Sequence, residues 1–140
     1  MLNQKILVVG ATGLLGGAIT RQLLEQGKEV RILVRQDSPS EELAKEGRAT
    51  PASALIAAGA QAVYGDLKDP ASLGPAMEGI DTVITTANSA SRWGDDNVEN
   101  CDLMGNRYLI EAAKKAGVKH FIFTSAFIAD PNSPVPLLSA

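Results

Sequence analysis

Three glycines spaced three residues apart follow the first apolar segment of the chain and constrain its fold more than any other feature. The segment 6–9 reads Ile-Leu-Val-Val, which is typical of a strand buried on both faces. Gly10, Gly13 and Gly16 then lead into a helical pattern. Glycine permits a tight turn and close approach of the backbone, and the N–H groups of a helix start attract an anion. The pattern predicts a strand-turn-helix unit that cradles a pyrophosphate, with a tight turn that holds no ligand as the alternative.

Apolar strand-like segments and helical patterns alternate along the rest of the chain. Further strands are predicted at 30–34, 60–64, 81–86 and 120–124. No plausible hairpin turn joins them, so we expect one α/β domain over 1–140, a Rossmann-type doubly wound parallel sheet. Right-handed crossovers favour five strands in the order 3-2-1-4-5. Such a sheet binds ligands beyond the carboxyl ends of its strands.

Helical patterns fill the gaps between these strands. The first helix ends before Gly27, and its apolar stripe is Leu15, Ile19 and Leu23. A capping-box pattern at 38–41 and a start signal at 50–51 predict two short helices where one would suffice. Asp69 is expected to cap a helix that runs through Met77. One face of a long helix before Gly117 is expected to carry Cys101, Gly105, Leu109, Ala112 and Ala116.

The end of the second strand distinguishes the two nicotinamide cofactors. NAD-binding domains place an acidic residue about 20 positions after the glycines, where it accepts hydrogen bonds from the ribose 2′-hydroxyl. Arg35 occupies that place here, and a guanidinium binds a 2′-phosphate through a fork of donors. The strand end therefore favours NADP(H). A nearby Asp37 leaves NAD(H) as the alternative, and a solvated arginine is the third interpretation.

Polar residues also follow the remaining strands. Asp66 can accept a hydrogen bond from the adenine amino group while Leu67 packs on the ring, or it is simply a polar turn residue. Residues 86–88 are expected beside the ribose and nicotinamide, with Ser125 facing the same crevice. Thr12 either donates its hydroxyl to a phosphate or caps the helix. The expected cofactor-binding residues are Gly10, Thr12, Gly13, Leu14, Leu15, Gly16, Arg35, Asp66, Leu67, Thr86, Ala87 and Asn88.

Composition narrows the classes of function. A net charge of −3 provides no basic surface for nucleic acid or an anionic membrane. One cysteine and one histidine are too few for a zinc cluster, so no metal site is expected. No apolar run reaches the roughly 18 residues that span a bilayer. The first residues run straight into a strand pattern with no signal-peptide core, so we expect a cytoplasmic protein.

Five segments carry a family resemblance. They read Gly-Ala-Thr-Gly-Leu-Leu-Gly at 10–16, Leu-Val-Arg at 33–35, Gly-Asp-Leu at 65–67, Asn-Arg-Tyr-Leu-Ile-Glu-Ala-Ala at 106–113 and Gly-Val-Lys-His-Phe-Ile-Phe-Thr-Ser at 117–125. In this order they resemble the short-chain dehydrogenase/reductase superfamily, and more narrowly its atypical, extended NmrA-like NAD(P)H-binding branch. The resemblance implies an extended-type Rossmann fold that binds NADP(H), with Arg35 on the 2′-phosphate and Asp66 near adenine.

The same resemblance raises a difficulty for catalysis. Redox members of the family commonly follow a serine, matched here by Ser125, with Tyr-x-x-x-Lys, whose tyrosine transfers the proton. No such pattern follows Ser125 in the 140 residues. The sixth strand and the C-terminal substrate lobe of related proteins are likewise expected to be missing from 1–140.

Two functions are compatible with these observations. The first is the NADP(H)-binding domain of an oxidoreductase, with hydride transfer to a small substrate near Asn88 and Ser125, which is then the tentative catalytic residue. The second is a non-catalytic NAD(P)-sensing protein that regulates or assembles with a partner. A sheet that ends at its fifth strand exposes an edge, which leaves pairing with a second copy or another protein open.

Overall fold

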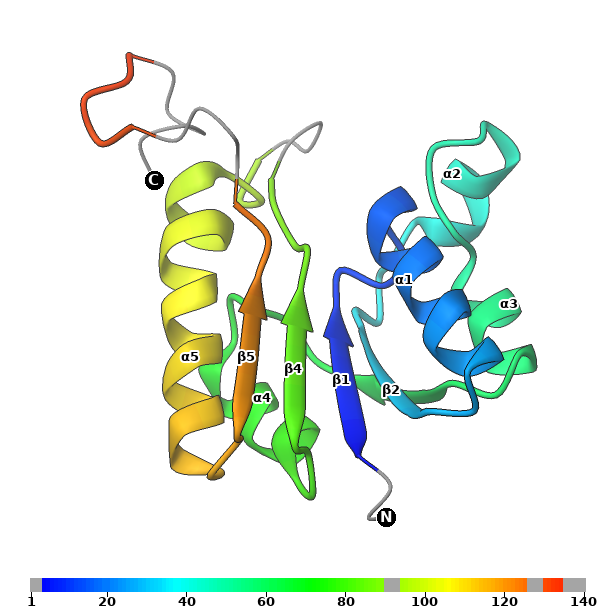
Figure 1. The fold of residues 1–140 in the computed structure, drawn as a ribbon. Helices are drawn as coiled ribbons and strands as arrows, with labels where there is room; N and C mark the ends of the chain where they lie inside the picture. Colours follow the sequence, from blue (N-terminus) through cyan, green and yellow to red (C-terminus); the bar gives the residue numbers. More distant parts are fainter. Residues whose placement is uncertain (1–3, 90–93, 126–129, 135–140) are drawn as a thin grey trace.

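One sheet of five parallel strands organises the computed structural model, which describes residues 4–89, 94–125 and 130–134 (Figure 1). The strands are β1 (Lys5–Val9), β2 (Glu29–Val34), β3 (Gln61–Tyr64), β4 (Thr82–Thr85) and β5 (His120–Phe123). Their order is β3-β2-β1-β4-β5, which confirms the predicted Rossmann-type topology. The register pairs Val9 with Thr85 and Thr85 with Phe123. The carboxyl ends of the strands therefore lie along one edge.

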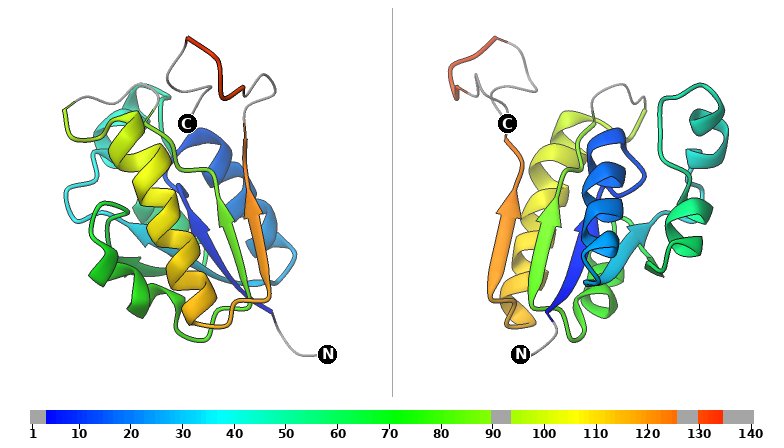
Figure 2. Two further views of the ribbon diagram at one scale, coloured as in Figure 1. Left: turned by 90° about the vertical axis from the view of Figure 1, so that its left-hand side faces the viewer. Right: turned by 45° about the vertical axis from the view of Figure 1, so that its right-hand side comes forward.

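Helices cover both faces of the sheet (Figure 2). They are α1 (Leu14–Glu25), α2 (Ser40–Lys45), α3 (Ala52–Ala57), α4 (Pro70–Met77), the π-helix η1 (Val98–Gly105) and α5 (Asn106–Lys115). On one face, Leu73 of α4 and Leu109 of α5 pack with Val83. On the other face, Leu55 of α3 packs with Ile32. Among the described residues, no helix is long and apolar enough to cross a bilayer.

Helix starts follow the sequence signals in one case and not in another. The Asp69 carboxylate accepts a hydrogen bond from the Ala71 N–H at 3.2 Å, so α4 begins as predicted. The two short helices α2 and α3 are also present. The predicted capping box at 38–41 was wrong, because α2 begins without a side-chain cap. Glu41 instead accepts hydrogen bonds from the backbone N–H and the hydroxyl of Ser53, at 3.1 and 3.0 Å, and so caps the start of α3.

The face of α1 that packs on the molecule differs from the predicted stripe. The buried residues of α1 are Gly16, Gly17 and Thr20. Leu15 is 53% exposed, and Ile19 and Leu23 are only half-buried, so the predicted apolar stripe is not the buried face of α1. Glycines allow the helix axis to approach its neighbours closely, and this approach rotates the larger Leu15 toward solvent.

The predicted long helix begins as a π-helix. In η1 the hydrogen bonds run from i to i+5, so each turn takes more residues than in an α-helix. A spacing of 3.6 residues then no longer locates the buried face. Of the predicted face, Cys101, Gly105 and Leu109 are buried, Ala112 is half-buried, and Ala116 lies beyond α5 and is exposed. Ala113 is buried in place of Ala116.

Candidate cofactor-binding site

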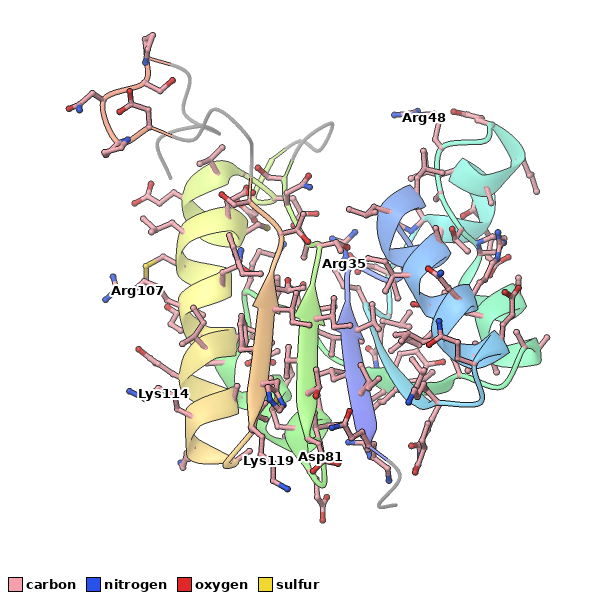
Figure 3. The ribbon with its side chains drawn as sticks, in the orientation of Figure 1. Arg35, Arg48, Asp81, Arg107, Lys114 and Lys119 are labelled. Carbon is pink, nitrogen blue, oxygen red and sulfur yellow. The ribbon has the colours of Figure 1, made fainter. Side chains whose placement is uncertain are left out.

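The predicted site residues follow strands that all end at the same edge of the sheet. Arg35 follows β2, residues 65–68 follow β3, residues 86–88 follow β4, and Ser125 lies shortly after β5. With the turn after β1, these segments lie at the upper edge of the sheet in Figure 1. Figure 3 shows Arg35 at this edge, whereas the label of Asp81 marks the opposite one. The structure thus brings the predicted segments together, and their contacts with a cofactor stay predictions.

Gly10 and Gly16 are both required by close packing at the turn. Gly10 has a φ of +84°, in the left-handed region, and a β-carbon there would lie 2.6 Å from Oγ1 of Thr86. A β-carbon on Gly16 would lie 2.0 Å from the carbonyl oxygen of Gly10. Gly13 is exposed, and it is the N-cap of α1 without a side-chain cap. The backbone N–H groups in the first turn of α1 therefore have no capping side chain, and they are available to an anion.

Thr86 links the turn to the neighbouring strand. Its Oγ1 lies 3.4 Å from the carbonyl oxygen of Val9 and 3.3 Å from that of Gly10. Ala87 is half-buried beside it, and the exposed Asn88 donates its side-chain amide to the carbonyl of Thr86 at 3.4 Å. The β4 end therefore holds the turn in place, and Asn88 projects from it toward solvent.

Thr50 is a second support of the turn, which the sequence did not reveal. Its backbone N–H donates to the carbonyl of Thr12 at 2.8 Å, and its hydroxyl lies 3.3 Å from the carbonyl oxygen of Gly13. A β-carbon on Gly17 would lie 1.9 Å from Oγ1 of Thr50. The residues before α3 thus dock on the glycine-rich turn. The one signal for this contact was a fourth glycine, Gly17, directly after Gly16.

Arg35 and Lys68 both pair with the carboxylate of Asp96, a residue that the sequence analysis did not single out. Nη1 of Arg35 lies 2.5 Å from Oδ2 of Asp96, and Nζ of Lys68 lies 2.6 Å from Oδ1. Burial alone raises the pKa of Asp96. Hydrogen bonds and charges from Lys68 and Arg35 outweigh that effect and hold the pKa of this carboxyl below its ordinary value. The hydrogen bond to Asp96 raises the pKa of Lys68 against the opposing effect of burial.

The predicted adenine contacts differ in exposure. Asp66 is half-buried, and its Oδ1 accepts a hydrogen bond from the Lys68 backbone N–H at 2.9 Å. Leu67 is buried in the core, where a β-carbon on Gly105 would lie 2.9 Å from its Cβ. The neighbouring Lys68 lines an open hollow of about 400 Å³, together with Asp95, Asn100, Met104 and Tyr108. Of the predicted pair, Asp66 is therefore the more accessible to a ligand.

Three other predicted residues are exposed at this edge. Leu14 and Leu15, in the first turn of α1, are 61% and 53% exposed. Ser125 is exposed beyond β5. Side chains at these places are open to a bound molecule.

Comparisons with known proteins agree with this geometry. A model of the NmrA-like family matches residues 2–138, nearly the whole chain. The chain is similar to the Photosystem II assembly factor Ycf39 of Cyanophora paradoxa, with 42% identity over 134 residues, which are 95% of this chain and 37% of the relative. It is also similar to the NAD(P)H azoreductase of Xenophilus azovorans, with 35% identity over 132 residues, which are 94% of this chain and 39% of the relative.

A solved structure supports the same fold. The crystal structure of gox2253 aligns with a TM-score of 0.74 and 29% identity, and the match covers 98% of this chain and 44% of that one. The chain thus spans less than half the length of each of these three proteins.

Proposed function

The chain belongs to the NmrA-like family of the short-chain dehydrogenase/reductase superfamily, and we propose that it is the NADP(H)-binding domain of an oxidoreductase. The observation that carries this proposal is the uncapped start of α1 on the turn from Gly10 to Gly16, with Arg35 and Lys68 at the adjoining strand ends. The chain spans only 37% and 39% of the two curated relatives. That the whole protein transfers a hydride is therefore proposed as well.

The residues at the carboxyl edge fit the parts of a dinucleotide. The glycine-rich turn and the first turn of α1 would hold the pyrophosphate, because the N-cap Gly13 has no side chain to occupy the N–H groups at the start of the helix. Arg35 and Lys68 would hold the 2′-phosphate, and Asp66 would accept from adenine. Residues 86–88 would lie against the ribose and nicotinamide. The bound nicotinamide supplies the hydride, and the hydroxyl of Ser125 would orient a small substrate.

Titration with the two cofactors tests this assignment. We expect NADPH to bind more tightly than NADH in calorimetry. Arg35→Ala should weaken NADPH about tenfold or more, because it removes a charge-assisted hydrogen bond, and NADH less than about twofold. The control is Arg48→Ala, which removes an exposed arginine that pairs with Glu46 on the loop after α2 (Figure 3). Equal weakening of both cofactors by Arg35→Ala contradicts the 2′-phosphate contact, and no binding of either cofactor overturns the proposal.

A non-catalytic regulatory or assembly role is the second candidate. The observation that favours it is 42% identity to a protein named as a Photosystem II assembly factor. The same site would then serve to sense NAD(P) rather than to turn it over. A cytoplasmic location and pairing with a second copy stay predictions.

Turnover separates the two candidates. NADPH oxidation is followed in the presence of quinones, carbonyl compounds and azo dyes, the last because one relative is named as an azoreductase. Oxidation of NADPH with any of these substrates, reduced by Arg35→Ala at limiting NADPH but not by Arg48→Ala, supports the oxidoreductase. Tight cofactor binding without turnover across the panel favours the sensing role.

A further inference from the structure

Asp96 stands between two cations that follow neighbouring strands. Its Oδ2 is 2.5 Å from Nη1 of Arg35 and its Oδ1 is 2.6 Å from Nζ of Lys68. Arg35 directly follows β2 and Lys68 comes shortly after β3, strands that pair with Val34 opposite Tyr64. Asp96 belongs to a different part of the chain, just before η1, and its side chain is only 14% exposed. The carboxylate is therefore inserted between the cations.

Arg35 and Lys68 together form a binding site for an anion with two oxygens, which we call the seat. Asp96 presents one oxygen to each cation. A phosphate monoester presents oxygens in a similar way but carries a charge of about −1.5 to −2, against −1 for a carboxylate. An arginine binds such a group through a fork of donors, and a lysine adds a point charge. The chemistry that holds Asp96 therefore favours a phosphate monoester more strongly.

We propose that Asp96 is an internal competitor for the 2′-phosphate of NADP(H). Its carboxylate occupies the seat made by Arg35 and Lys68 in the free protein, and the 2′-phosphate enters as Asp96 leaves. This inference rests on the proposed function and adds a residue that determines cofactor specificity. Competition lowers affinity only for cofactors with the 2′-phosphate, because the apparent affinity is reduced by the fraction of molecules whose seat is open.

Displacement of Asp96 would also affect the start of η1. The thiol of Cys101 in η1 lies 3.8 Å from Oδ1 of Asp96. Asn97, which directly follows Asp96, is the N-cap of η1, and its side-chain oxygen accepts a hydrogen bond from the Asn100 N–H at 2.9 Å. Movement of Asp96 out of the seat would disturb these contacts at the start of η1. NADP(H) therefore has a route by which it alters this helix, and NAD(H) does not.

The test compares Asp96→Asn with Glu99→Gln, which removes the same charge from an exposed residue in the first turn of η1. Each protein is titrated with NADPH, NADH, adenosine 2′,5′-bisphosphate and 5′-AMP. The last two probes differ only by the 2′-phosphate. Asp96→Asn should tighten NADPH and the bisphosphate about tenfold, if the seat is closed in about nine molecules of ten, and change NADH and 5′-AMP less than twofold. Glu99→Gln should change all four less than about twofold.

The outcomes separate this inference from the proposed function. If NADPH binds the wild type and Asp96→Asn brings no gain, or an equal gain for NADH, the competitor role is overturned. Weaker NADH binding by Asp96→Asn also overturns it, because Asp96 would then accept from the ribose 2′-hydroxyl. If neither cofactor binds any of the proteins, the proposed function falls. Asp96→Ala, with folding checked by circular dichroism, should reproduce the gain if the asparagine variant does not fold.

Discussion

A β-carbon on Gly16 would stand 2.0 Å from the carbonyl oxygen of Gly10, so the turn after β1 and the first turn of α1 are in direct backbone contact. Oγ1 of Thr86 lies 2.8 Å from the same position. The end of β4, which is distant in the sequence, therefore meets the turn and the start of α1 at a point where only a hydrogen atom fits. The packing itself requires this glycine, whether or not a ligand is bound.

Gly16→Ala is expected to destabilise the fold by about 3 kcal/mol, near the upper end of the cost of overpacking, because the contacting atoms are backbone and cannot rotate away. The measurement is the free energy of unfolding in urea. The control is Gln22→Ala, at an exposed position of α1. That change should alter the free energy of unfolding by less than about 0.5 kcal/mol. If Gly16→Ala has the same midpoint urea concentration as the wild type, the backbones at Gly10 and Gly16 are not in close contact.

The fold was predictable because its signals are local. The continuous apolar run of β1 and the Asp69-Pro70 start of α4 each depend on neighbouring residues, and handedness rules then order the strands. The buried face of α1 was not predicted from the stripe of Leu15, Ile19 and Leu23. The spacing of these residues carries no information about how closely the helix packs through its glycines. The long helix failed because spacing rules assume the α-helical period, which η1 does not follow.

The position of a candidate site residue was predictable only where the residue follows a strand. Arg35 and Asp66 were placed at the carboxyl edge of the sheet in this way, and their contacts with a cofactor stay predictions. Asp96 was missed because it is 61 positions from Arg35 and lies in a polar loop, where an acidic residue is usually solvated. Thr50 was missed because its contact with Gly17 depends on how the residues before α3 pack against α1. Contacts between loops follow from tertiary structure and leave no periodic pattern.

The contact between Gly17 and Thr50 predicts energetic coupling. Gly17→Ala should destabilise the fold by about 2 kcal/mol, because its β-carbon would lie within 1.9 to 2.9 Å of three side-chain atoms of Thr50. Thr50→Gly removes all three atoms, so the alanine should cost about 1–2 kcal/mol less in that background. Urea unfolding of the wild type, both single variants and the double variant measures the coupling. Additive costs within about 0.5 kcal/mol would show that the two residues do not meet.

Asn106 is expected to hold the junction between η1 and α5. Its buried side-chain amide donates to the carbonyl of Asp102 at 2.9 Å, and its Oδ1 lies 3.5 Å from the hydroxyl of Thr85. Asn106→Leu keeps a similar volume but leaves these groups without their partner, at a cost of about 1–3 kcal/mol in unfolding free energy. Asn132→Ala, at an exposed position, should change it by less than about 0.5 kcal/mol. Hydrogen exchange should also show faster exchange across η1, and unchanged exchange there would contradict this role.

Asp96 makes the stability of the fold depend on pH. Its pKa in the folded state is lowered, because Lys68 and Arg35 outweigh the effect of burial. The charged carboxylate therefore stabilises the fold above its unfolded pKa of about 3.9, and this contribution is lost as the pH falls through the lower folded value. We expect Asp96→Asn to melt below the wild type at neutral pH, because two cations lose their shared anion. The gap in Tm should stay constant down to about pH 5 and then shrink as the pH falls further. An equal gap at acid and neutral pH would mean that the charge of Asp96 does not stabilise the fold.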